Sequence, residues 1–288
     1  MRVMLRMKIF FESDKEVICF CEHLFQHNKQ LAVNWQVNEK WGNQLIIQSD
    51  QLNEMIFQAV AQSLVNVYIT YRLRNAVKEI IHNTYYFSEQ HEIEKIYELA
   101  EWIITGEDAD SKWLRDNKHP VQLLRAIFLM HIRNAQTVHY DSIVQFGMKA
   151  FKHDLIHYVG LAIDEFKREE EHQSFLNSLR EYIIKKEPNV PVIHVVDGTT
   201  FSYYNDSGIR YSKVELRTIM KKAPLYLFGF PEEEWNLAPL IALAPEKIHL
   251  YVEDPSTPKT QTILNVFQEK VELKSMNEFP YSFTSQRQ

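Results

Sequence analysis

The chain has 288 residues, of which 45% are hydrophobic and 12% aromatic, and its formal net charge is −6. This composition supports a packed core and excludes a disordered chain, and the acidic balance disfavours a protein that binds duplex nucleic acid over one basic face. Because the chain has only 7 glycines, glycine-built phosphate loops and tight all-β folds are disfavoured and helix is favoured.

The two cysteines, Cys19 and Cys21, are too few for a disulfide scaffold, so a reducing compartment is expected. The N-terminal stretch is apolar but is interrupted by Arg6 and Lys8, which is typical of a strand rather than of a signal peptide. No apolar run approaches the roughly 18 residues that a membrane span needs. We therefore expect a cytoplasmic protein without a membrane partner.

The first 52 residues are predicted to form a small β-α-β-β segment. Three short stretches have the pattern of strands, namely residues 7–11, 31–37 and 44–48. Between the first two, Ser13 and Asp14 can cap a helix that runs to about Gln26. On this helix Cys21 projects into the apolar arc, whereas Cys19 and His23 project to the other side. With His27 these residues form a possible metal cluster, but one helix cannot direct all four at a tetrahedral ion, so core packing is expected for Cys21.

Residues 53–187 are predicted to be almost entirely helical. Apolar side chains recur at helical spacing in five stretches, at about residues 53–84, 89–105, 120–131, 141–166 and 173–186. The polar stretch Glu107–Asp116 separates two of these helices and is predicted to be an internal loop.

Residues 188–276 are predicted to form an α/β segment that ends in a β-α-β unit. The apolar run Ile248–Val252 is typical of a buried strand, and Val271 and Leu273 alternate into another. Between them Thr257 can cap a helix, with Pro258 at its first position. The crossover predicts that the two strands are parallel. The polar remainder, residues 277–288, is predicted to be loosely ordered.

Several stretches of this chain resemble one known family. They are VIHVVDG, YNDSG, LAPLIALAPEKIHLY and TILNVFQEKVEL between residues 192 and 273, and ITYRLRN at residues 69–75. Together they resemble the YtxC-like family of sporulation proteins from endospore-forming bacteria, most clearly over residues 60–275. Arg74 and Asn75 stand where the family pattern has Lys and Asp. The resemblance implies a role in spore formation and implies no catalytic residues.

One helix pattern suggests a metal-dependent hydrolase as an alternative. His153 and His157 are four residues apart, and Asp154 follows the first of them, as in metal phosphohydrolases of the His-Asp type. At 100° per residue, both histidines and Asp164 fall within about 40° of one another, on the face opposite the apolar arc. His131 and His139 could be further ligands. The competing interpretation is a solvated polar face.

A second alternative is a nucleic-acid-binding accessory protein. Arg72, Arg74 and Lys78 lie on one predicted helix and could contact phosphates. The net negative charge and the missing aromatic platform disfavour this alternative.

Two places in the C-terminal segment are candidates for a ligand or interaction surface. Glu253 and Asp254 follow a predicted parallel strand and precede the helix start at Thr257, and open α/β sheets bind ligands at such ends. Upstream, the aromatic connector 225–237 contains Tyr226, Phe228 and Trp235. Because Trp235 follows three glutamates, it is predicted to lie near the surface as an anchor for a partner.

The sequence thus predicts an α+β protein whose mostly helical middle is flanked by small N-terminal and C-terminal α/β segments. No motif for a phosphate loop, a nucleophile elbow or a dinucleotide is present, so no cofactor, resident metal or catalytic set is expected. The favoured function is that of a non-enzymatic protein acting through an unknown protein partner.

Overall fold

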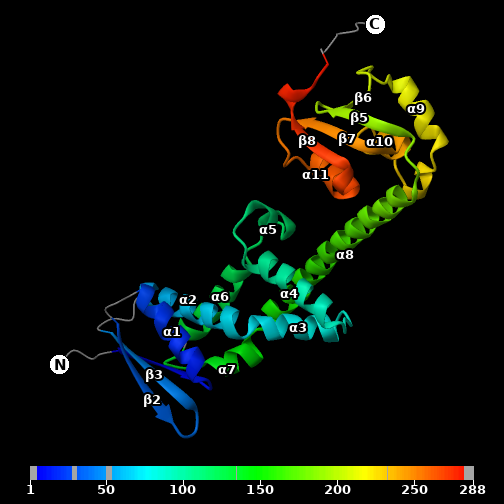
Figure 1. Cartoon of the computed structure of the whole chain (residues 1–288). Helices are drawn as coiled ribbons and strands as arrows, with labels where there is room; N and C mark the ends of the chain where they lie inside the picture. Colours follow the sequence, from blue (N-terminus) through cyan, green and yellow to red (C-terminus); the bar gives the residue numbers. More distant parts are fainter. Residues whose placement is uncertain (1–4, 28–30, 50–53, 134, 232, 282–288) are drawn as a thin grey trace. The chain divides into compact units, whose positions relative to one another are not determined.

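The computed structural model describes residues 5–27, 31–49, 54–133, 135–231 and 233–281. The chain forms two compact units, Met1–Arg168 and Glu169–Gln288, each built around its own core. Each unit contains a four-stranded mixed sheet (Figure 1). The fold is α+β with a helical middle region, as predicted, and the N-terminal and C-terminal strands belong to separate sheets.

The sheet of the N-terminal unit has the order β2-β3-β1-β4. Its strands are β1 (Leu5–Phe11), β2 (Ala32–Asn38), β3 (Gly42–Ser49) and β4 (Thr137–His139). The predicted hairpin joins β2 to β3, and β1 pairs antiparallel to β3. Gly42 has a φ of 73° at the turn, where a Cβ would lie 2.8 Å from the Phe11 carbonyl oxygen. Strand β4, which the sequence did not predict, adds parallel to β1.

Helices cover the buried side of this sheet and complete the core of the unit. They are α1 (Asp14–His27), α2 (Glu54–Tyr71), α3 (Leu73–Asn83), α4 (Gln90–Thr105), α5 (Ala109–Leu114), α6 (Pro120–Arg133), α7 (Tyr140–Ser142) and the π-helical turn η1 (Ile143–Gly147). Helix α2 packs on both α1 and α6. On α1, Cys21 is partly buried and packs against the core, as predicted, but Cys19, which was predicted to project to the other side, is buried even more deeply. The core extends further around α1 than the apolar arc suggested.

The predicted loop Glu107–Asp116 instead contains the short helix α5. The Asp108 carboxylate accepts a hydrogen bond from the Ser111 N–H and caps this helix. Arg115 is 2% exposed, and its guanidinium donates to the carbonyl oxygens of Ile103 and Lys118. Hydrogen bonds from one buried arginine, one of them to helix α4, therefore help to order a stretch that its polar composition predicted to be a loop.

A single helix, α8 (Lys149–Lys185), replaces the two helices predicted between residues 141 and 186. The charged stretch 167–172, predicted to separate them, continues the helix because Lys, Arg and Glu are good helix formers even without a buried face. The boundary between the two units falls within α8, whereas the sequence suggested one after residue 187. No helix in the described part of the chain has the length and apolar character that crossing a membrane requires.

The sheet of the C-terminal unit has the order β6-β5-β7-β8. Its strands are β5 (Val190–Val196), β6 (Ser202–Asn205), β7 (Pro245–Val252) and β8 (Val271–Ser275). Strand β7 pairs parallel with both β5 and β8, which confirms the predicted β-α-β unit. The helical elements are α9 (Lys213–Lys222), η2 (Leu225–Phe228), α10 (Ala238–Leu243), α11 (Pro258–Phe267), η3 (Gln268–Lys270) and η4 (Met276–Glu278).

The two faces of this sheet differ in chemistry. Alternation along β5 and β7 directs Ile193 and Leu250 into the core formed with α10 and α11, and directs His194 to the opposite face. On that opposite face the rings of Phe279 and Tyr281 lie edge-on to His194. Residues 277–281, part of the tail predicted to be loose, are therefore packed, because their aromatic rings cover apolar and histidine surface. Residues 282–288 lie outside the described residues.

Candidate functional site

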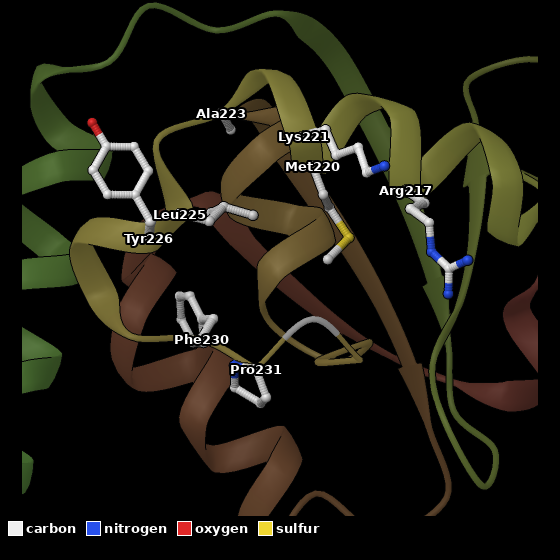
Figure 2. Close-up of a pocket in the computed structure, with 8 residues that line it drawn as sticks. All are labelled: Arg217, Met220, Lys221, Ala223, Leu225, Tyr226, Phe230 and Pro231. Carbon is white, nitrogen blue, oxygen red and sulfur yellow. The ribbon is translucent and has the colours of Figure 1, made fainter.

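The C-terminal unit contains an open pocket beside helix α9 (Figure 2). Its cavity volume is about 280 Å³. Figure 2 shows side chains from α9 on one side and side chains from the following segment on the other. The lining residues are Arg217, Met220, Lys221, Ala223, Leu225, Tyr226, Phe230 and Pro231.

Local sequence features place each wall of the pocket. Helix α9 begins with a capping box, in which Ser212 and Glu215 each bind the other's backbone N–H. Its apolar face buries Met220, which leaves Lys221 exposed beside the pocket. After η2, Gly229 adopts a φ of 65°, which favours glycine, and this turn brings Phe230 back to the opposite wall.

The pocket combines apolar walls with positive charge. Lys213, Arg217 and Lys221 recur every four residues and so follow one side of α9. The acidic residue of this helix, Glu215, has its carboxylate bound to the Ser212 N–H, and this hydrogen bond lowers the pKa of Glu215. The rim is therefore cationic, and the Tyr226 side chain at its edge is 80% exposed.

Trp235, predicted to lie near the surface, is of intermediate burial. Its ring is partly buried against the core and lies 5.7 Å from the charged groups of both Lys213 and Arg217. The Glu234 carboxylate turns back to accept hydrogen bonds from the N–H groups of Asn236, Leu237 and Ala238 at the start of α10. This cap draws the chain inward at Trp235. Glu232 lies outside the described residues.

Tyr226 and Phe228, from the same connector, have different environments. Phe228 is partly buried, and its ring packs edge-on to Tyr182 of α8 and tilted against Phe230. Tyr226 lies on the exposed side of the 3-10 turn η2. Tyr226 is therefore much more exposed to a partner than Trp235 is.

The structure places Glu253, Asp254 and Thr257 together between β7 and α11. Glu253 and Asp254 are exposed, and Asp254 Oδ1 accepts hydrogen bonds from Ser256 Oγ and Ser256 N, which lower the pKa of Asp254. Thr257 is the N-cap residue of α11. Its hydroxyl donates a hydrogen bond to Thr260 Oγ1 and accepts none from the backbone N–H groups of the helix. None of these residues lines the pocket beside α9.

The residues of the hydrolase alternative lie on the exposed face of α8. The His153 side chain is 87% exposed, its Nδ1 lies 3.7 Å from Asp154 Oδ1, and His157 is also exposed. His139 is held elsewhere, because its ring stacks on Phe10. Within the described ranges, no group of three or more His, Cys, Asp or Glu side chains is arranged to hold a metal ion.

The basic residues of the nucleic-acid alternative are engaged within the N-terminal unit. Arg72 pairs with Glu16 and with Asp141, each at 2.6 Å. Arg74 and Lys78 both pair with Glu94, at 2.8 and 2.5 Å. Paired in this way, the three side chains do not form a free basic stripe for phosphates.

Sequence reasoning missed two features of the C-terminal unit. The first is the pocket. The basic residues at every fourth position of α9, followed by an aromatic connector, were a sequence signal that could have indicated it. The second is a histidine pair. His194 and His249 are register partners in β5 and β7, with ring centroids 5.1 Å apart. Only the alignment of two parallel strands brings them together.

Comparison with known proteins identifies the family. The YtxC-like family matches residues 58–272, which include the pocket and Arg72, and the chain therefore belongs to this family. The uncharacterised protein YtxC of Bacillus subtilis (strain 168) is 28% identical over 289 residues, an alignment that covers 95% of each chain. No solved structure matches the chain.

Proposed function

We propose that this chain is a non-enzymatic interaction protein that acts in the cytoplasm during spore formation. The pocket beside α9 supports the interaction role, because it joins apolar walls, two cationic side chains and an exposed tyrosine on one surface. The sporulation role rests on the resemblance to the YtxC-like family. The cytoplasmic location rests on the cysteine content of the sequence.

The partner that fits this pocket is a protein segment with an apolar anchor flanked by acidic residues. Met220, Leu225 and Phe230 supply an apolar surface that an aliphatic or aromatic side chain can fill. Arg217 and Lys221 at the rim attract carboxylates and repel basic segments, which favours an acidic partner. An amphipathic helix with acidic flanks combines these two features.

Site-specific photocrosslinking in spore-forming cells tests this proposal. A photoreactive phenylalanine analogue is placed at Tyr226, and the same analogue at Tyr86 serves as the control. The two tyrosines are 80% and 83% exposed, and only Tyr226 lines the pocket. We expect a crosslinked protein from position 226 alone, and the crosslinked peptide should contain apolar residues beside Asp or Glu. Equal capture from both positions, or a basic crosslinked peptide, would contradict the proposal.

A charge reversal next to the pocket supplies the second arm of the test. Lys221→Glu changes the rim, whereas Lys222→Glu makes the same change one residue away on an exposed position that does not line the pocket. We expect Lys221→Glu to reduce crosslinking from position 226 at least about tenfold, since like-charge contacts cost several kcal/mol. Lys222→Glu should reduce it much less. Equal effects would mean that general charge, and not the pocket, selects the partner.

A further inference from the structure

Strand β2 is an unusual sheet edge in this protein. Edge strands expose unpaired N–H and C=O groups, and proteins commonly protect them with short length or with charged residues. Among the described residues, β4 has 3 residues and β6 has 4, and β8 carries Glu272 and Lys274. Strand β2 has 7 residues, AVNWQVN, and none of them is charged or a proline.

Val33 of β2 packs against the core of the unit, whereas two other apolar side chains of the strand are exposed. Val33, Trp35 and Val37 pair with Ile47, Leu45 and Asn43 of β3, whose side chains are buried on the core side of the sheet. Trp35 and Val37 share that side but are 44% and 82% exposed. Among the described residues, the β2–β3 hairpin extends beyond the helices of the N-terminal unit, and no described helix covers its far end (Figure 1).

The sequence of β2 reads almost the same in both directions from Trp35. Two copies of the strand, placed antiparallel around a two-fold axis at Trp35, would align Val33 with Val37 and Asn34 with Gln36 of the second copy. The Trp35 rings would meet at the centre. These central pairs are alike in chemistry, with apolar residues against apolar residues and amides against amides, and only the terminal pair, Ala32 with Asn38, is unlike.

We propose that β2 pairs with β2 of a second copy of this chain and forms a two-fold symmetric dimer with one continuous eight-stranded sheet. The contact is isologous, because the same seven residues serve on both sides. The valine and tryptophan pairs cover each other on one face, and the amide pairs exchange hydrogen bonds on the other. Backbone hydrogen bonds satisfy the outer edge of β2.

A second copy fits this edge better than an unrelated strand does. Pairing with an unrelated strand would not depend on any symmetry in the sequence of β2. Self-pairing does depend on it, because it places the residues before Trp35 opposite the residues after it, and these residues are alike in chemistry. The absence of charge from β2 also favours self-pairing. A charged residue in this strand would lie near the same charged residue of the second copy, and their repulsion would oppose dimer formation. One strand per copy makes a small interface, so dissociation in about the micromolar range is expected.

The test changes the amide pair, which is exposed in the single chain. In Asn34→Lys/Gln36→Lys, lysines of the two copies face each other at both symmetry-related positions. In Asn34→Lys/Gln36→Glu, each lysine faces a glutamate instead. Sedimentation velocity of the full chain, from about 1 to about 100 µM, measures the dimer dissociation constant. We expect the double-lysine variant to raise this constant at least about tenfold and the lysine–glutamate variant to restore it to the wild-type value or below.

Three results would overturn the proposal. The first is a wild-type chain that stays monomeric over the whole range, which would leave the edge for a strand of another protein. The second is a dimer that the double-lysine variant leaves intact. The third is a lysine–glutamate variant that dissociates as much as the double-lysine variant, because a pairing centred on Trp35 must distinguish the two. Far-UV circular dichroism and the thermal midpoint of each variant confirm that the chain remains folded.

Discussion

Arg72 and Glu16 form a two-point ion pair across 56 positions of sequence. Arg72 Nε donates to Glu16 Oε1 at 2.6 Å, and Nη2 donates to Oε2 at 3.0 Å. The Glu16 side chain is 2% exposed, and burial raises the pKa of its carboxyl although Arg72 acts against this rise. The same guanidinium bonds to Asp141, so Arg72 joins α1, the α2–α3 junction and α7.

Replacing Arg72 should destabilise the N-terminal unit. Arg72→Met leaves the buried Glu16 carboxylate without its counter-charge, and breaking a buried pair from one side costs about 3 kcal/mol. Urea unfolding followed by circular dichroism measures the loss. Arg74→Met is the matched control, because the side chain of Arg74 is 53% exposed and its pair with Glu94 is of the surface kind, worth under about 1 kcal/mol. Equal losses in the two variants would refute a special role for Arg72.

The histidine pair should make the stability of the C-terminal unit depend on pH. Burial, followed by the charge of His249, lowers the pKa of His194; burial, followed by the charge of Lys274, lowers the pKa of His249. Asp206 and Glu272 act in the opposite sense but do not reverse these shifts. The unfolded chain therefore binds protons near pH 6.5 that the folded unit does not bind, and stability should fall as the pH decreases from about 7 to about 5.

Thermal midpoints measured at several pH values in that window check this expectation. His194→Asn should flatten the acid-side loss, even though it also removes the 2.9 Å contact of His194 Nδ1 with the Tyr251 hydroxyl. His153→Asn changes an 87% exposed histidine and should leave the slope as in the wild type. A slope that His194→Asn does not change would place the titrating group elsewhere.

Glu234 should stabilise the start of α10 as a carboxylate cap. Its two oxygens accept four hydrogen bonds, from the N–H groups of three successive residues, and charge-assisted bonds of this kind are stronger than neutral ones. Glu234→Ala should therefore cost about 1–2 kcal/mol of stability. Glu233→Ala, at an exposed neighbouring position, should cost less than about 0.5 kcal/mol. Chemical unfolding of both variants distinguishes a cap from a general loss of negative charge.

Substitutions of Trp235 and Tyr226 should have different effects, one on stability and the other on partner binding. Trp235 packs against the core and lies near two cations of α9, so Trp235→Ala should lower stability by about 2–3 kcal/mol. Tyr226→Ala, at an 80% exposed side chain, should change stability by less than about 0.5 kcal/mol. Once the crosslinked partner is identified, its affinity should fall for Tyr226→Ala. The reverse assignment, with an unaffected melting point for Trp235→Ala, would restore Trp235 as the surface anchor.

The parts of this fold that depend on neighbouring residues could be predicted from the sequence. The apolar run Ile248–Val252, the capping position of Thr257 and the alternation of Val271 and Leu273 all lie within one β-α-β unit, and the structure confirms that unit. Helix α9 (Lys213–Lys222) is likewise set by local signals, namely its capping box and its basic end. Family membership could also be recognised, since it depends on ordered motifs along the chain.

The features that join distant segments emerged only in the tertiary structure. Burial of Arg115 turned a polar stretch into helix α5, and the partial burial of Trp235 followed from a cap formed by its neighbour. The Arg72–Glu16 pair and the His194–His249 pair each link positions more than 50 residues apart. The physical reason is that periodicity reports which side of an element is apolar, whereas packing decides how much of that side another element covers. The uncovered side of β2 and the pocket beside α9 are both results of that coverage.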